Sequence, residues 1–154
     1  MIKVLTAVAL VAGLTSACST GQMQIRSEEP TLEIDSLALL EGPRVAIELL
    51  VHNRNDHSLV LESLGLTMSL DQTRLFSSEW PMPLTIGARG RERITLEAPA
   101  SRDGASRLSE LAGELAGSLA YQLESRLVLQ GQRDAKNRKS DFLHPVPGQP
   151  DRFR

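Results

Sequence analysis

The stretch Arg44–Asp56, RVAIELLVHNRND, decides the fold class of this chain. Four apolar residues occupy every second position, which places them on one side of an extended chain: Val45, Ile47, Leu49 and Val51. Asn53, Asn55 and Asp56 follow, and such residues favour turns because their side chains hydrogen-bond to the nearby backbone. The stretch therefore predicts a β-strand with one buried face, ended by a turn.

The same alternation continues on both sides of this strand. Thr31–Leu39 changes phase near Ser36, and Leu59–Leu70 changes phase at Glu62 and Ser63. A phase change inside one strand moves side chains to the other face and indicates a β-bulge. Two turns are predicted as hairpins. The first, Asp71–Gln72, leads into a short strand, Thr73–Phe76, and the second is Gly87–Gly90.

The apolar period changes to that of a helix only once. Five residues have helical spacing: Leu108, Leu111, Ala112, Leu115 and Leu119. Asp103 or Ser106 is the candidate N-cap, and Gly117 is the candidate stop. Alternation then resumes over 121–129, a polar loop covers Gly131–Lys139, and a last strand contains Phe142, His144 and Val146. The end from Pro147 is expected to fray. The fold class is all-β, a sandwich of seven to eight strands with one short helix before the penultimate strand.

The first residues predict export and an anchor. Lys3, the apolar run Val4–Leu14 and the small residues before Cys18 are typical of a signal peptide, residues 1–17. The run is too short to cross a bilayer, which needs about 20 apolar residues. Cys18 is the only cysteine, and its position resembles a bacterial lipoprotein processing site, which implies cleavage before Cys18 and its acylation. The alternative is ordinary cleavage, which leaves a periplasmic protein with a spare thiol.

The remaining chain divides into a tether, one domain and a tail. Residues 18–30 are polar and are expected to be flexible, residues 31–147 form the domain, and residues 148–154 are the tail. Ser19 rather than Asp follows Cys18, which by the sorting rule of lipoproteins predicts the periplasmic face of the outer membrane. With a formal net charge of −2, the chain has no global field that would attract nucleic acid.

Three segments together resemble the group 2 late embryogenesis abundant proteins, which share the water-stress and hypersensitive-response (WHy) domain. They are VHNRND at 51–56, SLVLESLGLTMSLDQTRLF at 58–76 and RERITLEA at 91–98. The resemblance continues to about Val146, and Asn53 and Asn55 match the Asn-Pro-Asn turn of that family, with Arg54 in place of Pro. It implies an immunoglobulin- or fibronectin type III-like sandwich, an association with desiccation and other stress, and no catalytic residues.

The residues by themselves give little sign of catalysis or cofactor binding. His52 and His57 flank one turn and His144 lies on another strand, so a metal site would need the fold to bring them together. Asp56, His57 and Ser58 contain the residue types of a catalytic triad, but consecutive residues cannot supply its geometry. We expect a protein that is not an enzyme and that has no cofactor.

Two features are candidate contacts. Arg133, Lys136, Arg138 and Lys139 form the one basic cluster, which is either a solvated turn or a contact for a lipid phosphate or an anionic partner. Trp80 is either a half-buried residue that closes the end of a strand or an exposed contact for a partner or lipid.

The function expected from these observations is that of a lipid-anchored envelope protein. Its sandwich would bind or protect client proteins during desiccation or envelope stress, with the membrane contacted through acylated Cys18. The alternative is a lipid-binding or lipid-transfer module with an apolar cleft between the sheets. The oligomeric state does not follow from the sequence.

Replacing Cys18 with Ser tests the anchor. Without the thiol no acyl chain is attached, and the folded domain should move from the membrane fraction into the soluble periplasmic fraction. Fractionation and the mass of the mature protein measure this. A native protein that partitions into water without detergent, or that carries no acyl groups, would contradict the prediction.

Overall fold

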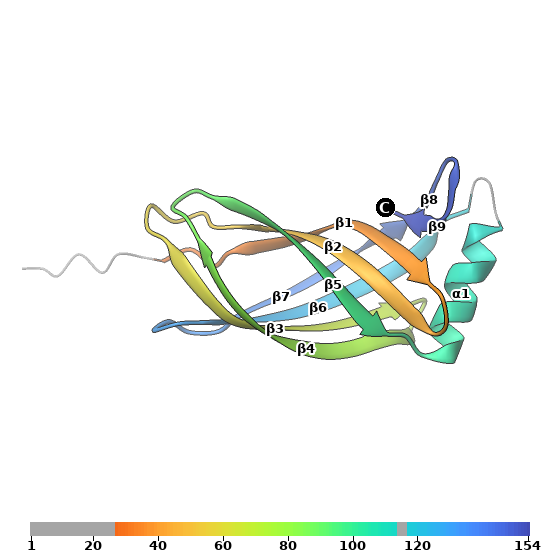
Figure 1. Cartoon of the computed structure of the whole chain (residues 1–154), viewed down its shortest axis with the longest axis horizontal. Coiled ribbons are helices and arrows are strands. Elements are labelled where there is room, and N and C mark those ends of the chain that lie inside the picture. Colours follow the sequence, from red (N-terminus) through yellow and green to blue (C-terminus); the bar gives the residue numbers. More distant parts are fainter. Residues whose placement is uncertain (1–26, 114–116) are drawn as a thin grey trace, which may run out of the picture.

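The computed structural model describes residues 27–113 and 117–154, which form two packed antiparallel sheets and one helix (Figure 1). One sheet has the strand order β5-β2-β1-β9-β8 and the other has β4-β3-β6-β7. The elements are β1 Thr31–Leu40, β2 Arg44–His52, β3 Leu59–Leu70, β4 Thr73–Ile86, β5 Arg91–Pro99, α1 Arg102–Ala112, β6 Leu119–Leu129, β7 Ala135–Leu143, β8 Pro145–Val146 and β9 Gln149–Phe153. The all-β sandwich class is confirmed, with nine strands in the described residues.

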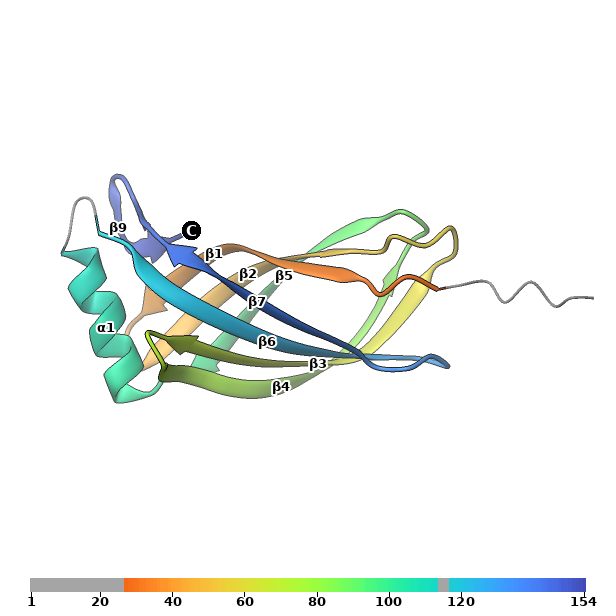
Figure 2. The ribbon, with the colours of Figure 1, turned by 180° about the vertical axis from the view of Figure 1, so that it is seen from behind.

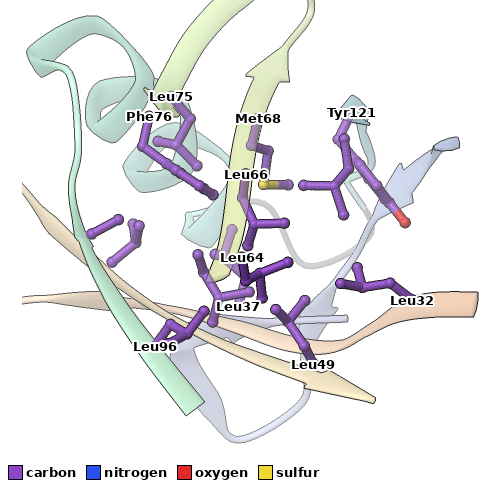
Figure 3. Packing of buried hydrophobic residues seen from close by; sticks show 14 of the residues in the cluster. Leu32, Leu37, Leu49, Leu64, Leu66, Met68, Leu75, Phe76, Leu96 and Tyr121 are labelled. Atoms are coloured by element: carbon purple, nitrogen blue, oxygen red, sulfur yellow. The ribbon is translucent and has the colours of Figure 1, made fainter. Parts of the chain in front are cut away.

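The alternating strands produce one aliphatic core between the sheets. On β2 the predicted inner residues Val45, Ile47, Leu49 and Val51 are all fully buried, which confirms the phase of the strand. They belong to one buried cluster with residues of the opposite sheet, among them Leu64, Leu66 and Met68 of β3 (Figure 3). The predicted inner side of β6, which includes Leu123, Leu127 and Leu129, is buried as well.

Both phase changes seen in the sequence are irregularities in strand pairing. β1 slips against β2 between Ile34 and Ser36, and β3 slips against both neighbours between Leu61 and Ser63. The Asp71–Gln72 hairpin is also confirmed, since β3 pairs with β4 across it. Both turn residues have positive φ, 43° and 70°, as a tight hairpin requires even without glycine.

Two expectations about β4 are wrong. The short strand Thr73–Phe76 extends to Ile86, because Pro81 and Pro83 lie on an outermost strand, where a missing N–H breaks no ladder hydrogen bond. The Gly87–Gly90 segment is not a hairpin, since β4 and β5 belong to different sheets. It carries the chain from one layer of the sandwich to the other.

The helix caps one end of the sandwich (Figure 1). Its N-cap is Ser101, which accepts from the backbone N–H of Gly104 at 3.0 Å, and not Asp103 or Ser106. It ends at Gly113 rather than at Gly117, and Leu119 already belongs to β6; Leu115 lies outside the described residues. A Cβ at Gly104 would lie 2.8 Å from the Cα of Leu75, so the helix approaches β4 closely because this residue has no side chain.

The expected polar loop and frayed end are largely strand. β7 begins at Ala135, within the expected loop, and its inner residue near the end is Leu143, while Phe142 is 56% exposed. The expected phase of this strand is therefore inverted. Beyond Pro147, β9 pairs with β1 and β8, and Phe153 is fully buried in the core. A single aromatic residue near the chain end gives no periodic signal from which this docking could be predicted.

Replacing Leu49 with Ala should lower the free energy of unfolding by about 2–5 kcal/mol, because a fully buried leucine leaves a cavity. Leu50→Ala is the matched control, since the next side chain points to the outer face and is only partly buried. Its cost should be under about 1 kcal/mol. Urea unfolding measures both, and equal losses would mean that the two faces of β2 are not distinguished by burial.

Candidate functional site

The turn between β2 and β3 lies at the end of the sandwich opposite α1 (Figures 1 and 2). A buried asparagine of this turn, Asn53, connects the two sheets. The Nδ2 of Asn53 donates to the carbonyl oxygens of His57 at 2.7 Å, Gly87 at 2.9 Å and Ile86 at 3.3 Å. Its Oδ1 accepts from the backbone N–H and the Nδ2 of Asn55, at 3.0 and 3.1 Å. One fully buried side chain thus holds the β2–β3 turn against the end of β4.

Asn55 holds the chain that leads into β1. Its Oδ1 accepts from the backbone N–H of Glu28 at 2.7 Å, and its Nδ2 donates to the carbonyl oxygen of Glu28 at 2.8 Å. The Ser27 hydroxyl lies 3.4 Å from the same Oδ1. Residues 27 and 28 of the expected flexible tether are therefore bound to the domain. Asn53 and Asn55 with these partners are the Asn53–Asn55 cluster.

Exposed ion pairs surround this cluster. Arg54 lies 3.1 Å from Glu28, and Arg89 lies 2.7 Å from Asp56. The hydrogen bond from Arg89 and its positive charge lower the pKa of Asp56, so this carboxylate is ionised and occupied. Because exposed pairs contribute little to stability, the asparagine amides carry most of the order at this end.

The predicted basic cluster follows a strand rather than a loop. Arg133 lies in the β6–β7 turn, while Lys136, Arg138 and Lys139 lie on β7. Lys136 and Arg138 share the outer face of β7. Lys139 lies an even number of residues from the buried Ala135, so it shares the inner face with Ala135. Arg138 pairs with Glu124 at 2.5 Å. Strand pairing thus presents basic side chains on both faces of β7.

A polar hollow of about 640 Å³ lies beside this strand, over the outer face of the four-stranded sheet. Gly65 contributes no side chain there, and the hydroxyls of Thr67 and Ser77 lie within 2.8 Å of each other. Lys136 and Arg138 line the hollow on the β7 side. It is an open depression in the surface, not a cleft between the sheets.

Trp80 closes one side of the sandwich. It is partly buried against the core, and its Nε1 donates at 3.2 Å to the carbonyl oxygen of Glu97 on β5. This contact joins the outermost strands β4 and β5 of the two sheets. Trp80 is half-buried, as the first interpretation expected, but it lies in the middle of β4 and not at the end of a strand.

Residues 48–139, more than half of the chain, match the family described as late embryogenesis abundant protein. The chain belongs to this family. The matched region runs from the middle of β2 to the middle of β7, so it includes Asn53, Asn55 and Trp80.

Solved structures related to the chain are distant in sequence. A protein from Archaeoglobus fulgidus is 10% identical, with 75% of this chain and 93% of that chain covered and a TM-score of 0.47. A protein from Arabidopsis thaliana is 10% identical, with 77% of this chain and 88% of that chain covered and a TM-score of 0.49. A candidate late embryogenesis abundant (LEA) protein is 13% identical, with 79% of this chain and 75% of that chain covered and a TM-score of 0.47. No curated protein matches the chain.

The histidines of this family member are not assembled into a site. In residues 27–113 and 117–154, no group of three or more His, Cys, Asp or Glu is placed to hold a metal ion. Asp56, the first residue of the triad-like run, is bound to Arg89 instead of His57. Cys18 lies outside the described residues. Over the described ranges, no helix is both long and apolar enough to cross a membrane.

Sequence reasoning missed one polar cluster, at the bulge of β1. Ser36 is buried, and its hydroxyl donates to Glu48 at 2.7 Å, while Arg152 of β9 donates to Ser36 at 2.9 Å and also pairs with Glu48. The Ser36 hydrogen bond and Arg152 lower the pKa of Glu48. The Glu48–Arg152 pair stabilises the fold when the pH is above the usual pKa of a carboxyl group. This contribution to stability is lost as the pH falls through the lowered pKa of Glu48.

Replacing Asn53 with Ala should cost about 3 kcal/mol, since several buried backbone groups lose their partner. Asn137→Ala is the matched control, because that amide makes one 3.5 Å hydrogen bond, to the Pro30 carbonyl. It should cost under about 0.5 kcal/mol. Thermal unfolding measures both, and equal costs would contradict a special role for Asn53.

Asn53→Asp gives a sharper test, because it keeps the shape of the side chain. A carboxylate facing three carbonyl oxygens is disfavoured, so its pKa in the folded state should rise above the unfolded value. The variant should regain stability relative to the parent below the usual Asp pKa and lose it as the pH rises. A pH-independent difference between variant and parent would sink this interpretation.

Proposed function

We propose that this chain is a non-enzymatic, lipid-anchored protein of the bacterial envelope that binds and protects client proteins during desiccation or envelope stress. The observation that carries the proposal is the family match over residues 48–139, since the family implies stress association and no catalytic residues. The geometry supports it: the polar groups described above hold strands and turns together. They do not converge on a shared reacting position.

The docked residues 27 and 28 give the anchored domain a direction. Cys18 precedes Ser27 by nine residues, which span at most about 30 Å when extended. The chain reaches the domain at the Asn53–Asn55 cluster, so this end would face the membrane. The α1 end and the long sides of the sandwich would then remain accessible to clients (Figure 2).

The packing of the core favours the protective function over the lipid-transfer alternative. Large side chains from both sheets, such as Leu37, Leu64 and Phe153, are fully buried in one cluster. Three hollows over the described residues are lined mainly by polar side chains and not by the apolar side chains of the core. An acyl chain would need apolar space between the sheets.

The Cys18→Ser form of the chain should limit aggregation of an unrelated enzyme during drying and rehydration. No nucleotide or metal should be required, because the protection would come from surface and strand contacts. Residual enzyme activity and light scattering after rehydration measure the effect. The control is an inert protein of equal size, because crowding alone gives only a small stabilisation.

Protection no greater than that of the inert protein would count against the proposal. Lipid that co-purifies with the chain, and that is lost when Leu64 is enlarged to Phe, would support the lipid-binding alternative instead.

A further inference from the structure

The four outermost strands differ in how well they are protected from pairing with another chain. β4 contains Pro81 and Pro83, and on β5 the Glu97 carbonyl is engaged by Trp80. β8 has only two residues. β7 has nine residues and no proline, so it is the longest outermost strand of the described chain that keeps all its N–H groups. Such an edge can accept an added strand.

The pairing of β7 shows which of its backbone groups face outward. The N–H of Phe142 donates to the Asp141 side chain at 2.9 Å, and the N–H of His144, the next even-numbered residue, donates to the carbonyl oxygen of Arg154 at 2.9 Å; neither acceptor belongs to β6. Because the N–H and C=O of one residue point to the same side in an antiparallel pair, the even-numbered positions face away from β6. The Asp141 side chain binds the outward N–H of Phe142 at one end. Among the residues that the structure describes, the outward backbone groups of Lys136, Arg138 and Ser140 have no strand partner.

Charge selects the partner of this edge. Lys136 and Arg138 extend over the outer face, where Arg138 also pairs with Glu124 of β6, and Lys139 extends over the inner face. Asp141 is the one acidic residue of the strand. Two copies of β7 would bring like charges together, which disfavours self-pairing. A partner strand with acidic side chains on the outer face would remove this repulsion and form cross-strand ion pairs.

The inner face limits the other side chains of the partner. The Asn137 amide lies 3.5 Å from the Pro30 carbonyl, so the start of β1 is close to β7 on that side. Inward-pointing partner residues must therefore be small. A segment that alternates acidic and small residues satisfies both faces.

We propose that the edge of β7 from Lys136 to Ser140 binds an extended acidic peptide segment as an added antiparallel strand. The inference rests on the proposed function and names the class of client segment that it would recognise. A lipid surface fits less well, because a flat array of headgroups would meet the basic side chains of only one face of β7, whereas Lys139 lies on the other.

The test uses the full chain carrying Cys18→Ser and a fluorescent peptide of four Glu-Thr repeats. In the proposed complex the Glu residues lie opposite the even positions of β7, so their N–H groups bond to it and the Thr N–H groups face solvent. N-methylation of the two central Glu residues should weaken binding at least about tenfold. N-methylation of the two central Thr residues, which leaves the charge the same, should change it less than about twofold. Fluorescence anisotropy measures both.

Lys136→Glu should weaken binding of the unmodified peptide roughly tenfold, because a like charge replaces an attractive one. Arg107→Glu is the matched control, with the same change of charge on an exposed residue of α1. It should leave binding unchanged. Equal unfolding temperatures of the two variants and the parent establish that the fold is retained.

Three outcomes would overturn the proposal. Equal binding of the two N-methylated peptides would mean charge attraction without strand pairing. Absence of peptide binding, with binding to phosphatidylglycerol vesicles that Lys136→Glu abolishes, would assign the edge to a lipid surface. If the Lys136→Glu variant protects the enzyme during drying as well as the parent chain does, the β7 edge does not bind clients, while the proposed function stands. If the parent chain itself gives no protection, the proposed function is refuted instead.

Discussion

The way the two sheets meet at one end depends on the buried side chain of Asn53. Asn53 is fully buried. Its side chain donates hydrogen bonds to the carbonyl oxygen of His57, in the turn between β2 and β3, and to that of Gly87, directly after β4. Hydrophobic burial holds the sheets together but has no direction, so it does not define how their ends meet. Hydrogen bonds are directional, so those made by Asn53 away from water define how the ends of the sheets meet. A buried polar group left without a partner costs stability. Asn55 then extends the same network to the chain that precedes β1.

The sides of the sandwich are closed in different ways. Between β4 and β5, Trp80 spans the two sheets and two prolines remove N–H groups from the edge. Between β1 and β7 the closure is lighter, with one long amide contact from Asn137. β9 completes the first sheet by inserting Phe153 into the core, and the Ser36–Glu48–Arg152 contacts hold it there. The asymmetry leaves β7 as the longest outermost strand of the described residues that keeps all its N–H groups.

These observations connect the architecture to the proposed work of the protein. An anchor at the Asn53–Asn55 end would hold the domain upright on a membrane, with its long sides turned toward other proteins. A packed core leaves the surface and the edges as the places where clients can bind. Basic residues on both faces of β7 suit acidic extended segments and at the same time oppose pairing between copies.

The sequence by itself determined the parts of the fold that repeat. Alternation on β2, β3 and β6 predicts their buried faces, and the phase changes on β1 and β3 predict the two bulges, because side-chain direction in a strand is a local property. Where the local sequence signal is weak or ambiguous, contacts in the tertiary structure decided which conformation the segment adopts. Gly87–Gly90 has the composition of a hairpin, yet its strands join different sheets. Lys136, Arg138 and Lys139 resemble a polar loop, yet pairing with β6 makes them a strand. Phe153 is buried, and Asn53 connects the sheets, only because segments distant in sequence surround them. Such contacts leave no period in the chain, so physical reasoning from sequence found the residues of the turn but not the interactions that they make.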